Sequence, residues 1–156
     1  NSSNMNEIVR YDLSTQNSGE WTTIAKVNEA NQRGGVAFVV EDKVYAGLGE
    51  KSNGIRNGFY VSSDSLTKWE LIPSIPAQLG VISSGVYDEQ KKSFFMIDND
   101  GKIWEYNLTT EQWTSRSLWI RMKNYHMFML DGSIYILGQD IYQKNKFTVY
   151  NPIWDN

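Results

Sequence analysis

Four similar phrases, each starting at a tyrosine and ending at a tryptophan, divide the chain into segments of nearly equal length. They span residues 11–21, 60–69, 106–113 and 150–154. The tryptophans that end them are separated by 48, 44 and 41 residues. Repeats of roughly 40–50 residues are typical of units that each form one small sheet and must stack on their neighbours to bury a hydrophobic face. We therefore expect a series of stacked repeats.

A second phrase, between the tryptophans, predicts a β-hairpin in each repeat. Residues 38–49 align with residues 128–138, and residues 85–97 carry a more divergent copy. In these copies, β-branched and aromatic runs flank a short turn. Asp131-Gly132 and Asp100-Gly101 favour type I′ hairpin turns, because glycine accepts a positive φ angle. Helical periodicity is missing, so we expect an all-β chain.

Each complete repeat is expected to contain four antiparallel strands. The predicted first strands are Val36–Val40, Val81–Tyr87 and Met127–Leu130, and their hairpin partners are Lys43–Leu48, Ser93–Ile97 and Ser133–Leu137. The predicted third strands are Ile8–Leu13, Gly58–Ser62, Ile103–Leu108 and Phe147–Tyr150, and the predicted fourth strands are Trp21–Val27, Trp69–Ile72 and Trp113–Arg116. The repeated tryptophans are expected to pack between neighbouring sheets.

This pattern resembles Kelch repeats. Its elements are an apolar strand, a short turn, an apolar strand with tyrosine and glycine, and a phrase such as Tyr11-Asp12-Leu13-Ser14-Thr15 before a tryptophan. In appearance it is similar to bacterial Kelch-like β-propellers of the galactose-oxidase central-domain type. The chain departs from Kelch repeats where Gly47-Leu48-Gly49 and a single Gly138 replace the usual glycine pair.

A second resemblance implies the same architecture. Ser62, Asp64 and Trp69 fit the spacing of the Asp-box of sialidase-like propellers, although Leu66 and Lys68 replace its glycine and threonine. Both resemblances imply a β-propeller, in which small sheets, called blades, stand around a central axis.

The implied fold is an incomplete propeller of about three four-stranded antiparallel blades, in one Kelch-like segment over residues 1–156. The expected divisions are a partial blade 1–30, a blade 31–78, a blade 79–120 and a partial blade 121–156. Propellers close with typically four to eight blades, so three cannot complete a ring. We expect the missing blades to come from a second copy, in a homodimer, or from the rest of a larger propeller.

The composition excludes several classes of function. Lys+Arg 15 against Asp+Glu 18 gives a net charge of -3 without a basic run, so we expect no nucleic-acid partner. No stretch approaches the roughly 20 apolar residues of a membrane span. The absence of cysteine excludes thiolate metal sites, and also the copper chemistry of galactose oxidase, which needs a Tyr–Cys cross-link. We expect no cofactor.

Candidate chemical residues have simpler structural interpretations. His126, the single histidine, starts an inner strand and is expected to be packed or hydrogen-bonded. The segment 98–103 resembles part of a calcium loop, but Met96 and Asn107 occupy the positions of two key ligands, so a hairpin turn is favoured over a calcium site. Three further carboxylates are better explained as turn caps than as a catalytic pair: Asp12, Asp64 and Asp98.

Connectivity predicts a ligand-binding face. In a four-stranded antiparallel blade, the loop between strands two and three and the link to the next blade emerge on the same side. The longer segments 50–57, 118–124 and 139–146 lie there. The candidate ligand-binding residues on this face combine aromatic and planar cationic groups that suit sugars, peptides or acidic groups. They are Arg33, Arg56, Trp119, Arg121 and Tyr142. The alternative is a solvated rim with an aromatic side chain anchoring the next blade.

We predict a non-catalytic interaction module that presents this loop-rich face to a protein or glycan ligand. The alternative is part of a glycan-active propeller enzyme, a sialidase-like hydrolase or a lyase, whose other catalytic residues lie outside this chain. A structural spacer is the third possibility. Resemblance to exported bacterial propellers implies a periplasmic, cell-surface or secreted location.

Overall fold

The computed structural model describes residues 7–13, 19–26, 35–51, 54–55, 58–63, 66–76, 84–98 and 100–152, in which all regular secondary structure is β. Sheet I pairs β1 (Glu7–Asp12) with β2 (Glu20–Lys26). Sheet II contains β3 (Val36–Val40), β4 (Lys43–Gly47), β7 (Phe59–Ser62) and β8 (Trp69–Ile72). Sheet III contains β9 (Gly85–Asp88), β10 (Ser93–Ile97), β11 (Lys102–Asn107) and β12 (Gln112–Trp119). Sheet IV contains β13 (Lys123–Leu130), β14 (Ser133–Gln139) and β15 (Asn145–Tyr150).

The sheets are antiparallel, and each follows the order of the sequence. This confirms the predicted all-β chain with four-stranded antiparallel sheets. A short hairpin, β5 (Glu50–Lys51) with β6 (Gly54–Ile55), extends the connection between β4 and β7 and was not expected from the sequence. The predicted strand Val81–Tyr87 begins at Gly85 in the described part of the chain, and residues 81–83 lie outside it.

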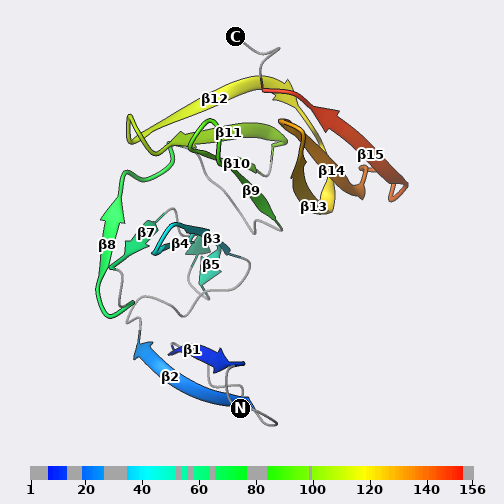
Figure 1. The fold of residues 1–156 in the computed structure, drawn as a ribbon. Helices are drawn as coiled ribbons and strands as arrows, with labels where there is room; N and C mark the ends of the chain where they lie inside the picture. The colour runs from blue at the N-terminus through cyan, green and yellow to red at the C-terminus, as the bar shows by residue number, and fades with distance from the viewer. Residues whose placement is uncertain are drawn as a thin grey trace.

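The four sheets follow one another along an open arc (Figure 1). The first strands β3, β9 and β13 lie on the inner side of the arc, and β8 and β12 lie on the outer side. Sheet I stands at one end of the arc and sheet IV at the other. Each sheet therefore has at most two neighbours, and the two end sheets have one each.

Sheet III is the centre of the core because both of its faces are covered. Side chains alternate between the two faces along a strand, and all five residues of β10 are buried. Phe94 and Met96 pack into the cluster shared with sheet II, while Phe95 and Ile97 pack into the cluster shared with sheet IV. Burying one such side chain stabilises the fold by about 1.5–3 kcal/mol, so the two clusters hold the three sheets together.

The repeated tryptophans do not share one environment. The Trp113 indole nitrogen donates a hydrogen bond to the Pro73 carbonyl at 2.7 Å, and its ring lies 6.0 Å from the Phe59 ring, so Trp113 packs between sheets II and III as predicted. Trp69 is half-buried. The prediction of a packed tryptophan is wrong for Trp21, which is 67% exposed because it belongs to the end sheet.

The hairpin turns follow the predicted chemistry only in part. Asp131 and Gly132 have φ angles of 49° and 72°, which confirms a type I′ turn between β13 and β14. The same prediction for Asp100-Gly101 is wrong, because β10 ends at Ile97 and β11 starts at Lys102, which leaves a four-residue loop. The physical reason lies in the side chain of Asp98, described below.

Candidate ligand-binding face

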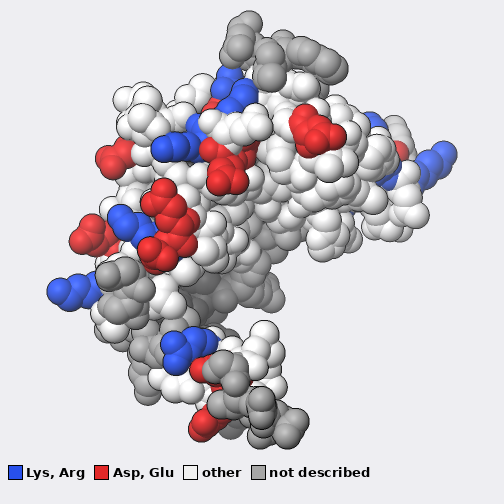
Figure 2. Space-filling view, viewed as in Figure 1, with Lys and Arg blue, Asp and Glu red and all other residues white. Residues whose placement is uncertain are grey.

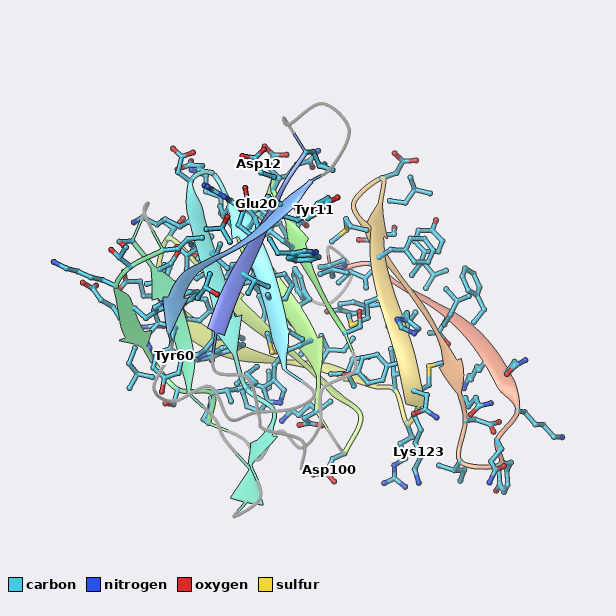
Figure 3. The ribbon with its side chains drawn as sticks, turned by 90° about the horizontal axis from the view of Figure 1, so that it is seen from below. Tyr11, Asp12, Glu20, Tyr60, Asp100 and Lys123 are labelled. Atoms are coloured by element: carbon cyan, nitrogen blue, oxygen red, sulfur yellow. The ribbon has the colours of Figure 1, made fainter. Side chains whose placement is uncertain are left out.

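The sheets have two distinct edges, which Figure 3 separates. Asp100 and Lys123 lie at one edge, and Asp12 and Glu20 lie at the opposite edge (Figure 3). We call the first edge the loop face; it carries residues 98–101, 120–124 and 139–145 and the hairpin β5–β6. We call the second the turn face. Asp100 follows the second strand of sheet III, and Lys123 follows the link to sheet IV, as the connectivity of the sheets requires.

The loop of sheet III is built around the carboxylate of Asp98. Its Oδ1 accepts hydrogen bonds from the backbone N–H groups of Asp100 and Lys102, both at 2.9 Å. Its Oδ2 accepts a buried hydrogen bond from the Trp104 indole nitrogen at 2.8 Å. These three donors fix the four-residue loop in place of a two-residue turn. They also confirm that Asp98 is a turn cap.

The loop of sheet IV repeats this construction. The Oδ1 of Asp140 accepts hydrogen bonds from the backbone N–H groups of Tyr142, at 2.8 Å, and Lys144, at 3.0 Å. The Asp140 N–H donates to the Lys144 carbonyl at 2.9 Å, just as the Asp98 N–H donates to the Lys102 carbonyl at 3.0 Å. The two loops share a sequence pattern, Asp followed four residues later by Lys, that could have predicted them.

A glycine positions the link between the two sheets. Gly101 has a φ angle of 89°, and a Cβ atom at this position would lie 2.6 Å from the Ile120 carbonyl oxygen. Only glycine accepts both this backbone conformation and this close approach. The link at Ile120 and Arg121 is therefore held directly against the loop of sheet III.

These three segments line an open cavity of about 310 Å³ on the loop face. The loop of sheet III contributes Asp100, the link contributes Arg121, Met122 and Lys123, and the loop of sheet IV contributes Ile141. Asp100, Arg121 and Lys123 are exposed, so the cavity has two cations and one carboxylate at its surface. It can bind an acidic group through its cations while its apolar residues contact a ring or an alkyl chain.

Two of the five predicted site residues lie at or next to this cavity. Arg121 lines it, and Tyr142, which is 74% exposed, follows Ile141 in the chain. Arg33 and Arg56 lie outside the described residues, as does the side chain of Trp119 at the end of β12. Four further residues line the cavity and were not among the predicted site residues: Asp100, Met122, Lys123 and Ile141.

The turn face, which is turned toward the viewer in Figure 2, carries acidic and basic side chains side by side.

Burial raises the pKa of Tyr106 to about 12, with smaller contributions from Glu111 and Tyr45. Burial likewise raises the pKa of Tyr45 and that of Tyr87, and nearby carboxylates including Glu41 add to both effects. These phenols stay protonated at neutral pH, so they are packing and hydrogen-bonding groups.

Other groups that could carry out chemistry have structural partners. Glu105 is buried and paired with Arg116, whose Nε donates to Glu105 Oε2 at 2.8 Å. Within the described ranges, no cluster of three or more His, Asp or Glu side chains could hold a metal ion.

His126 is exposed on the outer face of sheet IV, which is the face turned away from sheet III. Of the two expectations, a packed or a hydrogen-bonded imidazole, the packed one is wrong. His126 lines a second cavity, of about 560 Å³, with residues that include Leu137 and Phe147. The imidazole is exposed because no other described sheet covers this face.

Comparisons with known proteins identify the fold alone. No family model and no curated protein matches the chain. Among solved structures, 95 chains match, and they include YjhT, a propeller-type fold, with 18% identity and a TM-score of 0.56. The match covers 78% of this chain and 39% of YjhT, so the chain spans less than half of that protein. The chain is therefore an incomplete β-propeller whose sheets I to IV are complete or partial blades. In the part of the chain that the structure describes, no helix is long and apolar enough to cross a membrane.

Proposed function

We propose that this chain is a non-catalytic binding module whose loop face holds an acidic glycan or an acidic protein segment. The observation that carries the proposal is the cavity between sheets III and IV, where Arg121 and Lys123 stand beside Met122 and Ile141. A guanidinium group binds a carboxylate through two parallel hydrogen bonds, which gives both affinity and orientation. The cavity volume is at the lower end of the range for ligand pockets, which suits one sugar ring or one side chain.

The roles of the neighbouring groups follow from their positions. Met122 and Ile141 offer apolar contact for the ring of a sugar. Tyr142, the next residue along the chain after Ile141, is exposed. The carboxylate of Asp100 accepts hydrogen bonds from hydroxyl groups. An acidic sugar presents a carboxylate, hydroxyl groups and apolar ring faces together, so it uses all of these features.

The carboxylates support a binding role over hydrolysis. Most glycosidases need two carboxyl groups, one on each side of the scissile bond, about 5–9.5 Å apart. Asp98 and Asp140 hold loop backbones, and Glu105 holds Arg116. Among the described residues that line the cavity, this leaves Asp100 as the single carboxylate.

The alternative proposal is part of a sialidase-like hydrolase or a lyase. The match leaves more than half of YjhT without a counterpart in this chain. Residues from the other blades of a complete propeller could therefore complete a catalytic site, which favours this alternative. We also propose a Kelch type of repeat and a periplasmic, cell-surface or secreted location for the binding module. The repeat type rests on the Tyr-to-Trp phrases, and the location rests on their resemblance to exported bacterial propellers.

Titration calorimetry of the full chain with a panel of saccharides tests the proposal. The panel contains a sialoside, a uronic-acid oligosaccharide and a neutral sugar of the same size. We expect binding of an acidic sugar and at least about a tenfold loss of affinity for Arg121→Ala, since hydrogen bonds to charged groups contribute about 1.5–3 kcal/mol. Arg10→Ala, an exposed arginine in β1, is the matched control and should change nothing.

Three outcomes are decisive. Equal losses for Arg121→Ala and Arg10→Ala would contradict the site. Absence of binding across acidic sugars and acidic peptides would contradict the binding role. Release of a reducing end or an unsaturated product from any saccharide would replace it with the enzymatic alternative.

A further inference from the structure

The outer face of sheet IV, which also carries His126, exposes a group of large apolar side chains. Its large side chains are between 43% and 57% exposed, and they come from all three strands: Phe128, Leu130, Leu137, Phe147 and Val149. Tyr135 joins them: its ring is stacked on that of Phe128, with centroids 5.2 Å apart, and is tilted toward that of Phe147, with centroids 5.7 Å apart. A contiguous apolar surface of this kind marks an interaction site.

The same face is covered in sheet II. Phe38 pairs with Tyr45 across β3 and β4, as Phe128 pairs with Tyr135 across β13 and β14. In sheet II, Phe59 lies opposite Gly47 of the second strand. In sheet IV, Phe147 lies opposite Leu137 of the second strand in the same way. Phe38 is only 8% exposed and Phe59 is fully buried, because sheet III packs on them. Sheet IV therefore carries a docking face of the same design without its partner.

A Tyr–Trp pair of sheet III packs on this face of sheet II. Tyr106 and Trp113 are opposite each other on β11 and β12, with ring centroids 4.9 Å apart at 45°. The Trp113 ring lies 6.0 Å from Phe59, the residue that corresponds to Phe147. The Tyr106 side chain is buried in the same cluster.

Sheet I presents an equivalent pair at the other end of the arc. Tyr11 and Trp21 are opposite each other on β1 and β2, and their ring centroids are also 4.9 Å apart at 45°. Unlike their counterparts in sheet III, Tyr11 is 42% and Trp21 is 67% exposed. One end of the chain thus exposes the aromatic pair, and the other end exposes the surface that receives such a pair.

We propose that the outer face of sheet IV binds sheet I of a second copy of this chain, with Trp21 packed on Phe147 as Trp113 packs on Phe59. Head-to-tail contacts form a closed ring when the rotation between copies allows it, and the open arc leaves room for a second one (Figure 1). A pair of copies joined twice by this contact is the expected assembly.

Sedimentation equilibrium of the full chain tests the contact. We expect a dimer whose dissociation constant rises more than about tenfold for Trp21→Glu and, separately, for Phe147→Glu, because each change removes an aromatic side chain that the contact buries. Leu71→Glu is the matched control; it changes an apolar side chain that is 61% exposed but lies on β8, away from both end faces. Unfolding midpoints in urea show whether each variant keeps its fold.

The pattern among variants distinguishes the alternatives. Mixing Trp21→Glu with Phe147→Glu should give a tighter dimer than either variant alone, because one contact between the two chains remains intact. A dimer sensitive to Phe147→Glu but not to Trp21→Glu would overturn the proposal in favour of a contact between two sheet IV faces. A chain that stays monomeric at its highest soluble concentration would also overturn it and leave the face to the rest of a larger propeller.

Discussion

Replacing Asp98 with alanine tests how the loop face is built. The change removes the acceptor of three hydrogen bonds, from the backbone N–H groups of Asp100 and Lys102 and from the Trp104 indole. The two backbone donors lie in a partly buried loop, where water can replace the carboxylate. The indole nitrogen forms a buried hydrogen bond and would lose its partner.

The magnitude follows from these separate losses. Removing the acceptor of a turn or cap costs typically about 1 kcal/mol. A buried donor left without an acceptor costs a further 1–3 kcal/mol or so, and the loss is larger here because the acceptor is charged. We expect Asp98→Ala to lower the free energy of unfolding by about 3–4 kcal/mol. Asp140→Ala, which removes the equivalent backbone hydrogen bonds from a more exposed loop, should cost only about 1 kcal/mol.

Urea unfolding followed by circular dichroism measures both losses. A double-mutant cycle of Asp98→Ala with Trp104→Phe isolates the indole hydrogen bond, since the two side chains contact each other and their effects should not add. We expect a coupling of roughly 1–3 kcal/mol. Equal losses for Asp98→Ala and Asp140→Ala, with no coupling to Trp104, would refute the reasoning that the indole hydrogen bond holds this loop.

Two further predictions concern stability. The pKa of Tyr106 is raised to about 12 from 10.0 in a free phenol, so the folded state favours the neutral phenol. The contribution of this shift to the free energy of unfolding is fully present below pH 10 and is lost as pH rises toward 12. Urea midpoints between pH 8 and pH 12 measure this loss, and it should be smaller in Tyr106→Phe; an identical pH dependence would contradict the assignment. Gly101→Ala should cost about 2–4 kcal/mol and weaken ligand binding at Arg121, because its Cβ would collide with the Ile120 carbonyl at a positive φ angle. The matched control is Gly132→Ala, where φ is 72° with no atom within 4 Å, so it should cost only about 1 kcal/mol in thermal unfolding; equal costs would rule out the collision.

Local patterns in the sequence predicted most strands. Val36–Val40, Ser93–Ile97 and Trp69–Ile72 form strands with the predicted bounds, because turn residues and alternating side chains mark their ends within a few residues. The hairpin β5–β6 escaped prediction because its two-residue strands have too few side chains to show alternation. The turn at Asp100-Gly101 was predicted wrongly because the deciding donor, the Trp104 indole, lies outside the turn itself.

Burial and site composition depended on contacts that no local pattern contains. Trp21 and Trp113 end equivalent phrases, yet only Trp113 has a neighbouring sheet on its face, so their exposures differ. Connectivity correctly placed Arg121 on the loop face. It did not reveal Asp100 or Lys123 as cavity residues, because the cavity arises where the loops of two neighbouring sheets meet.

Amide chemical-shift mapping with an acidic saccharide is the most direct test of the loop face as a binding site. The full chain, labelled with nitrogen-15, would be titrated with the tightest acidic sugar of the panel. We expect the largest shifts at Asp100, Gly101 and Ile141 and in residues 121–123. Shifts concentrated on the turn face, around Glu41 and Glu111, would contradict the account.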